Sequence, residues 1–297
     1  MKLEEAIGKI GPLDQAAMEI AQKRWDSIAK PLHSLGKLET LLIQIAGITG
    51  SAEIDLSKRG LVAMCADNGV VEEGVTQTGQ EVTAIVAENF LRYDTSVGVM
   101  CRQNHAEIFP VDMGMVTDTK VRTDHKVAYG TKNMTKGPAM TREQAVKGIE
   151  AGIAMVEELK EKGYQILATG EMGIGNTTTS SAVASVLLKQ SVESMTGRGA
   201  GLTSEGLVRK IAAIRKAIEV NQPDPEDAVD VLAKVGGLDI AGMTGVFLGG
   251  AVYHIPVVMD GFISCVAALI AMEICPAAGD YIIASHVSKE PAAHLIL

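Results

Sequence analysis

The sequence predicts an α/β fold: a doubly wound, Rossmann-like parallel sheet, with a smaller helical part formed by the N-terminal segment. Two observations lead to this prediction. Short apolar runs that suit buried strands alternate with longer segments of helical periodicity, as in sheets covered on both faces. The apolar bulk comes from Ala, Val, Ile, Leu and 14 Met, while aromatic residues make up only 3% of the 297 residues.

The expected elements follow one another along the chain. The N-terminal part is expected to be helical, with leucine spacing that ends at Gly50. Strands are expected at 59–67, 106–114, 164–170, 251–261 and 280–286. Helices are expected at 81–104, 141–163, 176–190, 205–221, 226–236 and 262–274. We therefore expect a helical segment over 1–55 and a parallel α/β domain over 56–297.

Three local patterns refine these elements. Thr141 followed by Gln144 predicts a capping box at the start of the helix 141–163. The polar stretch 117–136 predicts a loop or a hairpin. The uncharged stretch 240–259 has the length of a membrane span, but it contains Gly249-Gly250 and Pro256. It is better explained by a helix, a glycine break and a buried strand.

Composition and charge exclude several classes of function. The net charge of −9 and the scarcity of aromatic residues argue against a nucleic-acid partner. The six histidines and four cysteines show no metal-ligand spacing, so we expect no metal site. The cysteines lie in apolar runs, and the charged N-terminus does not resemble a signal peptide. A cytoplasmic protein without a membrane segment is expected.

Polar residues follow every expected strand, where ligands bind to open parallel sheets. The segment after the third strand is the most informative. Gly173 and Gly175 allow a close backbone approach, and a helix starts near Asn176 with four consecutive hydroxyl residues at 177–180. The free N–H groups and the dipole of such a helix favour an anion, here a phosphate monoester. Because Glu171 would repel phosphate, it is expected to face another part of the substrate.

A second glycine-rich segment, at 196–207, precedes another helix. Lys210 lies one to two turns into that helix and could reach a phosphate, although a solvated surface lysine has the same spacing. A nicotinamide-dependent oxidoreductase is disfavoured because the first strand leads into DNGVVEEG instead of GxGxxG.

Several segments in this order resemble the nicotinate-nucleotide:dimethylbenzimidazole phosphoribosyltransferase family, including its phenol-using variant. The segments are KPLHSLGKLE, CADNGVVEEGV, TKGPAM, GEMGIGNTTTSSAV, TGRGAGLTSEGL, VNQPDPEDAVDVLAKVGGLDIAGMTG, VVMDGFIS and SHVSKE. The resemblance implies transfer of 5-phosphoribosyl from nicotinate mononucleotide to an aromatic base, a benzimidazole or a phenol such as p-cresol. Inversion at C1′ would give an α-riboside phosphate for cobamide biosynthesis, without a cofactor.

The resemblance also implies roles for individual residues. Glu171 is expected to be catalytic, orienting the ribose or supporting the proton acceptor. Substrate phosphate and ribose would be held by Gly173, Gly175, Asn176, Thr177, Thr178, Gly197, Gly199 and Lys210. The acceptor base would lie against Thr78, Gln80 and Val86. Supporting residues would be Asp239, Asp260 and Ser288. The family implies a dimer, either of identical chains or with a paralogous subunit.

The sequence departs from the family pattern in two regions. Asn68 stands where the family often has His, His33 replaces a glycine, and Thr78 and Val86 replace Ser and Gln beside the base. Val86 cannot hydrogen-bond an imidazole nitrogen, which favours a different acceptor. The family continues after SHxSxE to a glutamate regarded as the catalytic base, and the sequence ends before it at Leu297. A tail outside this sequence and a homologous subunit without the base are both open interpretations.

Overall fold

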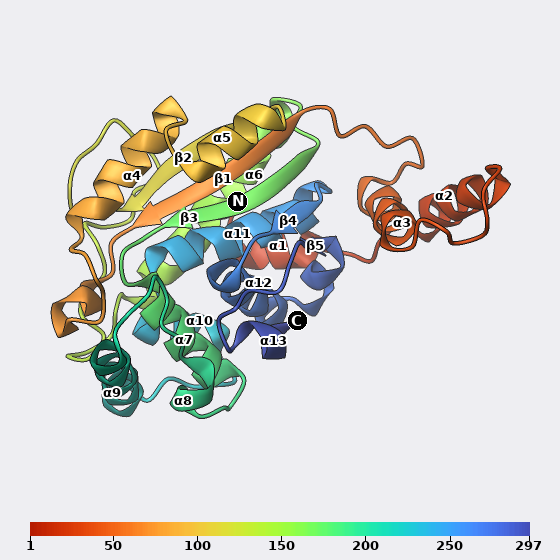
Figure 1. The fold of residues 1–297 in the computed structure, drawn as a ribbon. Helices are drawn as coiled ribbons and strands as arrows, with labels where there is room; N and C mark the ends of the chain where they lie inside the picture. The colour runs from red at the N-terminus through yellow and green to blue at the C-terminus, as the bar shows by residue number, and fades with distance from the viewer.

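The computed structural model describes all 297 residues (Figure 1). Five strands form one sheet: β1 (Arg59–Ala66), β2 (Ala106–Gly114), β3 (Ile166–Met172), β4 (Val257–Met259) and β5 (Ile282–Ala284). The helices up to the third strand are α1 (Leu3–Lys9), α2 (Gln15–Ser27), α3 (Lys37–Thr49), η1 (Gly69–Glu73), α4 (Glu81–Arg92), α5 (Ser96–Gln103) and α6 (Arg142–Glu161). Those after it are α7 (Asn176–Leu187), α8 (Val192–Met195), α9 (Ser204–Asn221), α10 (Ala228–Val235), α11 (Leu238–Tyr253), α12 (Phe262–Ile274), η2 (Pro276–Tyr281) and α13 (Ala293–Ile296).

The sheet is parallel throughout and has the order β2-β1-β3-β4-β5. Cys65 pairs with Asp112 on one side and with Met172 on the other, so the first three strands end nearly level. Helices α4 and α5 pack on one face, and α6, α11 and α12 form the layers on the other. From β1 the chain adds β2 on one side, and it then crosses over to add β3, β4 and β5 on the other side of β1. This reversal of the strand order confirms the predicted doubly wound α/β class.

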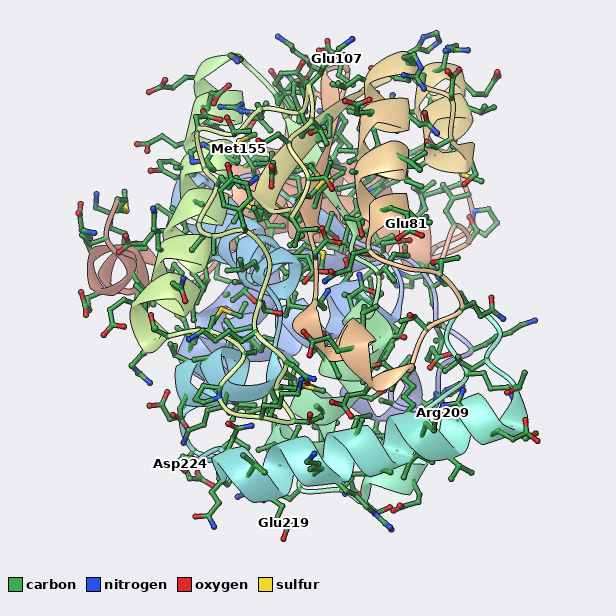
Figure 2. All side chains as sticks on the ribbon, turned by 90° about the vertical axis from the view of Figure 1, so that its left-hand side faces the viewer. Glu81, Glu107, Met155, Arg209, Glu219 and Asp224 are labelled. Carbon is green, nitrogen blue, oxygen red and sulfur yellow. The ribbon has the colours of Figure 1, made fainter.

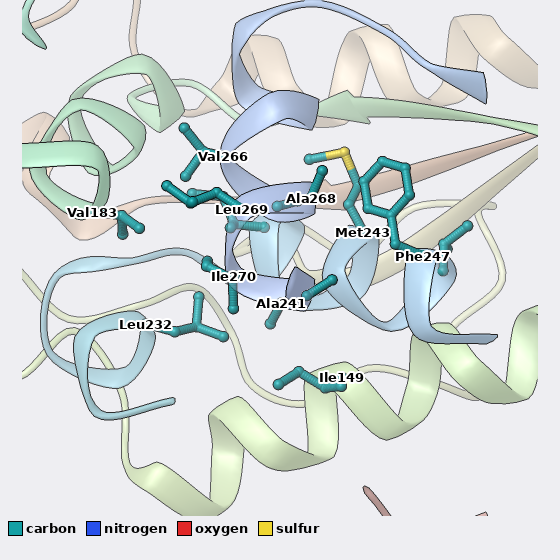
Figure 3. Close-up of a cluster of buried hydrophobic side chains, with 14 of the residues drawn as sticks. Ile149, Val183, Leu232, Ala241, Met243, Phe247, Val266, Ala268, Leu269 and Ile270 are labelled. Atoms are coloured by element: carbon teal, nitrogen blue, oxygen red, sulfur yellow. The ribbon is translucent and has the colours of Figure 1, made fainter. Parts of the chain in front are cut away.

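The largest core lies between the sheet and the α6, α11 and α12 layer (Figure 3). Every residue of α11 from Leu238 to Val252 is buried. Gly152 of α6 and Gly245 of α11 face each other so closely that a Cβ on either would meet the partner's backbone. This backbone contact lets α6 and α11 pack at short range and keeps the start of α11 fixed against the sheet.

The N-terminal helices divide between two places. Leu3 and Ala6 of α1 belong to the main core. Helices α2 and α3 form a hairpin that stands apart from the sheet in Figure 1. Gln44 Nε2 ties this hairpin to the carbonyl of Asp280 at 2.9 Å, and Tyr281 donates to the carbonyl of Gly11 at 3.0 Å. The predicted helical character of this segment is confirmed, including Gly50 as a left-handed cap of α3.

Two predicted elements differ from the structure. The single helix expected at 81–104 is two helices, because Tyr93 adopts φ +59° and Thr95 caps α5 by accepting from Gly98 N. The glycine break expected at Gly249-Gly250 is wrong, because α11 continues through both glycines to Tyr253. The strand expected at 251–261 is therefore shorter than predicted and covers only Val257–Met259. These glycines instead allow close packing, since a Cβ at Gly249 would meet Val156 at 2.9 Å.

Other local predictions are confirmed. The capping box of Thr141 and Gln144 is formed at α6, and Gly163 follows that helix at φ +81°. Residues 117–136 form a loop, which joins the sheet through one bridge between Val111 and Arg122. In this chain no helix combines the length and the apolar character that a membrane span requires.

Candidate functional site

Loops from all five strands meet at the carboxyl edge of the sheet, the side that faces the viewer in Figure 2. Asp67 and Asn68 follow β1 and are fully buried. Asp112, near the end of β2, pairs with Lys126 at 3.0 Å, so the charge of its carboxylate is balanced within the fold. The glycine-rich turn at 173–175 follows β3, Asp260 follows β4, and the segment 285–290 follows β5. The predicted gathering of polar side chains at this edge is therefore present.

The turn after β3 leads into α7 in the way an anion site requires. Gly175 has φ +96°, which favours glycine, and a Cβ at Gly173 would collide with Asp239 and the carbonyl of Ala66. Ile174 N donates to Thr83 Oγ1 at 3.1 Å, whereas the N–H groups of Gly175 and Thr177 have no acceptor in the protein. Unpaired donors at a helix start attract negative charge.

Glu171 and Asp239 share one amide group. Asn176 Nδ2 donates to Glu171 Oε2 and, at 3.0 Å, to Asp239 Oδ2, while Asp239 Oδ1 accepts from Ile240 N at 2.9 Å. Burial and the nearby Asp239 raise the pKa of Glu171 to about 8. Burial also raises the pKa of Asp239 to about 6. Since two carboxylates on one donor repel each other, the pair holds one proton at neutral pH.

Lys210 is a buried cation beside these turns. Its side chain on α9 is 0% exposed, and its Nζ lies 2.9 Å from Thr177 Oγ1 and 3.2 Å from the carbonyl of Gly197. Lys210 Nζ forms no salt bridge with a carboxylate, and burial lowers the pKa of Lys210 to about 8 although the charge of Glu290 opposes this shift. A surface lysine is therefore the wrong interpretation. A buried ammonium without an ion pair is costly, so this position is suited to an incoming anion.

A further carboxylate, that of Glu290, approaches the glycine-rich turn at 197–199 from the segment after β5. Glu290 Oε1 accepts from Gly199 N at 3.0 Å, and a Cβ at Gly197 would collide with the Glu290 carboxylate. Glu290 Oε2 is buried and has no hydrogen-bond partner. Ser288 contacts the same segment, because its Oγ accepts from Glu290 N at 3.3 Å.

Two hollows flank these groups. A cavity of about 150 Å³ brings together Thr78, the turn at 173–175, Asn176, Thr177 and Arg198. A longer groove of about 670 Å³ runs along β3 and ends at Glu171, Asp260 and Ser285. The structure thus places Glu171 and Asp260 in one hollow and most of the phosphate-loop residues in the other, with Asn176 linking them.

The remaining candidate residues lie at the margins. Gln80 Nε2 donates to the carbonyl of Asn68 at 3.2 Å. Val86 packs against the small core between α4 and the sheet. Of Thr78, Gln80 and Val86, only Thr78 lines one of these two hollows. Thr178 is fully buried, and its Oγ1 has no partner.

One group of side chains outside the edge has the spacing of a metal site. Asp124, His125 and Glu158 could place ligand atoms within reach of one ion. Arg122 binds both carboxylates, with Nη2 2.8 Å from Glu158 Oε2. Because the guanidinium already neutralises these acids, this cluster is an ion-pair network and is poorly suited to a cation.

Comparisons with known proteins show the family of the chain. The family model that matches residues 10–297 is described as "Phosphoribosyltransferase". The chain belongs to this phosphoribosyltransferase family. A nicotinate-nucleotide–dimethylbenzimidazole phosphoribosyltransferase of Ruminiclostridium cellulolyticum is 52% identical over 299 residues, which cover 100% of this chain and 85% of the relative. The enzyme of the same name from Clostridium tetani is 47% identical over 99% of this chain and 82% of its own length.

Solved structures give the same result for this phosphoribosyltransferase. A crystal structure of a nicotinate-nucleotide–dimethylbenzimidazole phosphoribosyltransferase from Thermus thermophilus superposes with a TM-score of 0.88 at 34% identity. The superposition covers 96% of this chain and 86% of that one. The chain is an enzyme of the pentosyltransferase type, and the family resemblance expected from its motifs is confirmed.

Three residues of this phosphoribosyltransferase were not expected from the sequence. Arg198 lines the smaller cavity, Glu290 enters the turn at 197–199, and Thr83 holds Ile174 N. Arg198 could have been found because it stands between two glycines of a run already singled out. Glu290 ends the segment SHVSKE, which was already singled out, but nothing local pointed to its contact with Gly199, which lies 91 residues away in the chain. Thr83 gave no signal, because its contact also joins segments 91 residues apart.

Proposed function

We propose that the chain transfers 5-phosphoribosyl from nicotinate mononucleotide to an aromatic base in cobamide biosynthesis, with inversion at C1′. One observation carries the proposal beyond family membership. The buried ammonium of Lys210 is held by a hydroxyl and a carbonyl and has no ion pair. A phosphate ester would supply the missing charge, and its oxygens could accept from Lys210 and from unpaired N–H groups of the loop.

The phosphate would lie between the two glycine-rich turns. Gly173, Gly175 and Thr177 contribute one wall, and Gly197, Gly199 and Lys210 contribute the other. Thr177 belongs to both, because a Cβ at Gly199 would come within 2.8 Å of Thr177 Oγ1. Thr178, in the first turn of α7, would support the turn at 173–175. Ser288, in the segment after β5, would support the turn at 197–199 through Glu290. The short approach explains why both turns carry glycine at these positions.

The acid pair would act on the ribose. Departure of nicotinate leaves positive charge on the sugar, as in glycoside hydrolysis. With one proton between them, Glu171 and Asp239 carry a single negative charge, which stabilises that positive charge without repelling the phosphate strongly. Asn176 fixes the distance between the two acids, and Asp260 closes the same groove. Glu171, the more exposed of the two paired acids, would orient the ribose.

The acceptor would enter from the side of Thr78, Gln80 and Val86. If the base reaches the half-buried side chain of Val86, which lines neither of the two hollows, a benzimidazole nitrogen left unpaired there would lose about 1–3 kcal/mol. A phenol presents one oxygen and an apolar ring, so it loses less. We therefore propose that the protein accepts phenols such as p-cresol as well as benzimidazoles.

We also propose that residues 1–55, which include the hairpin of α2 and α3, form a small helical unit. This unit would contribute to a dimer with an identical or a paralogous chain. Support comes from apolar side chains that this segment leaves exposed, Ile20, Leu32, Leu35 and Leu38. The rest of the chain, 56–297, would form the α/β domain. The four buried, unpaired cysteines fit a cytoplasmic setting.

A direct assay tests the reaction. The protein is incubated with nicotinate mononucleotide and, separately, with dimethylbenzimidazole, adenine, phenol and p-cresol, and α-riboside phosphate is measured. Lys210→Met should abolish binding of the nucleotide, whereas Lys216→Met removes the same charge from an exposed position on α9 and should not. Absence of any α-product, or equal binding by both variants, would contradict the proposal.

A further inference from the structure

The carboxylate of Glu290 occupies the turn formed by Gly197, Arg198 and Gly199. Its Oε1 accepts from Gly199 N at 3.0 Å, and its Oε2 lies where a side chain at Gly197 would have to be. Lys210 and Thr177 face the same turn from the other side. Three elements, the turn itself, α7 and α9, therefore surround the one carboxylate that the segment after β5 supplies.

The groups around Glu290 are those that a phosphate would use. A backbone N–H, a buried ammonium and a hydroxyl are strong partners for a phosphate oxygen, and each also suits a carboxylate. Yet Glu290 uses only the N–H group. Lys210 Nζ bonds to Thr177 and Gly197 instead, and Glu290 Oε2 is buried without a partner. A carboxylate placed for its own stability would be expected to satisfy this oxygen or to pair with the ammonium.

We propose that Glu290 is a stand-in for the substrate phosphate, which holds the turn at 197–199 in its binding shape and leaves when the nucleotide enters. This inference rests on the proposed function, because it assumes that the phosphate binds at Lys210. The carboxylate supplies an acceptor for Gly199 N in the absence of substrate. Phosphate then takes over that N–H and adds the bonds to Lys210 and Thr177 that Glu290 does not make.

The surroundings of Glu290 allow it to leave. Its side chain makes a single hydrogen bond, and residues 284–287 before it are largely exposed. Its backbone stays anchored, because Ala293 N donates to the carbonyl of Glu290 at 3.1 Å and Ser288 Oγ accepts from its N–H. A rotation of the side chain towards solvent is therefore enough, and no helix or strand has to move.

Titration calorimetry with nicotinate mononucleotide and with nicotinate riboside tests the proposal. Glu290→Gln and Glu290→Ala should bind the nucleotide about tenfold more tightly than the wild type, since a competing charged acceptor is removed. The riboside has no phosphate, so its affinity should not change. Glu273→Gln, which removes a charge from an exposed position on α12, should leave both affinities unchanged.

The outcomes separate this proposal from the proposed function. If Lys210→Met loses nucleotide binding while both Glu290 variants bind the nucleotide no more tightly than the wild type, the stand-in role is refuted and the phosphate position stands. If Lys210→Met binds the nucleotide normally, the phosphate position itself is wrong. A crystal structure of the wild type with nicotinate mononucleotide gives a second measurement that needs no variant. Glu290 should have left Gly199 N, and a carboxylate still bonded there beside bound phosphate would refute the proposal.

Discussion

Glu171→Gln should stabilise the protein near neutral pH while it reduces turnover. In the folded chain the pKa of Glu171 is raised from 4.5 to about 8, first by burial and then by Asp239. As pH rises above 4.5, the unfolded chain loses this proton before the folded chain does. The free energy of unfolding therefore falls with pH across this window and levels off above about pH 8. Glutamine has no proton to lose, so the variant escapes this loss.

The expected size follows from the width of the window. From pH 4.5 to pH 7, each pH unit is worth about 1.4 kcal/mol, which sets a ceiling of about 3 kcal/mol. Glu171 is only half-buried, so solvent screens part of this, and we expect about 2 kcal/mol. The Gln carbonyl can still accept from Asn176, so that hydrogen bond is kept. For a chain of this length the gain corresponds to a rise in Tm of about 4 °C.

The assay is a series of thermal melts between pH 4.5 and pH 8.5, with turnover measured at pH 7. The difference in Tm between variant and wild type should be near zero at the acid end and largest above pH 7. Turnover should fall by roughly 10²–10⁴-fold. Glu273→Gln, at an exposed position on α12, should show no such rise in Tm. A variant that is less stable than the wild type above pH 7 would mean that Glu171 is ionised and structural, and the reasoning would be refuted.

Two further predictions concern specificity and packing. Val86→Gln should raise kcat/KM for dimethylbenzimidazole relative to kcat/KM for phenol by roughly tenfold or more, as one restored buried hydrogen bond would. If the wild type already prefers dimethylbenzimidazole strongly and the variant changes nothing, Val86 is only a core residue. Gly152→Ala should lower the free energy of unfolding by about 3 kcal/mol, because the new methyl group meets the backbone of α11, and chemical denaturation measures this loss. Gly8→Ala is the matched control, since its Cβ meets nothing and alanine favours the helix by about 0.5–1 kcal/mol.

The periodic parts of the fold were predictable, and the parts that depend on contact between distant segments were not. Apolar runs predicted all five strands, and the longest of these runs, at β1 and β2, are buried over five consecutive residues. In the structure β4 and β5 are only three residues long each. The break at Tyr93 was missed because a left-handed tyrosine has no composition signal. The glycines at 249–250 were misread as a break because their role, close approach to α6 and β4, exists only in the folded chain.

The site divides in the same way. The glycine turn at 173–175 and the helix that follows it were predictable from local chemistry, and so was the position of Asp260 after the fourth strand. Asp239 was expected near the site only from the family resemblance. The sequence left Lys210 open between a surface and a site position, and the structure resolves this by its burial. The shared amide of Asn176 and the approach of Glu290 were not predictable, because each joins residues from separate elements through a single hydrogen bond.

The complete burial of α11 gives the two sides of the site different dynamics. Amide hydrogens of a helix buried on all sides exchange with solvent only when the surrounding layers separate. Asp239 lies in the first turn of that helix, so the acid pair keeps one member in place for as long as the domain stays folded. The turn at 197–201 and the segment 284–290 are more exposed and can open locally. Bound nucleotide should therefore slow exchange in the turn and in that segment, while the amides of α11 stay as protected as before.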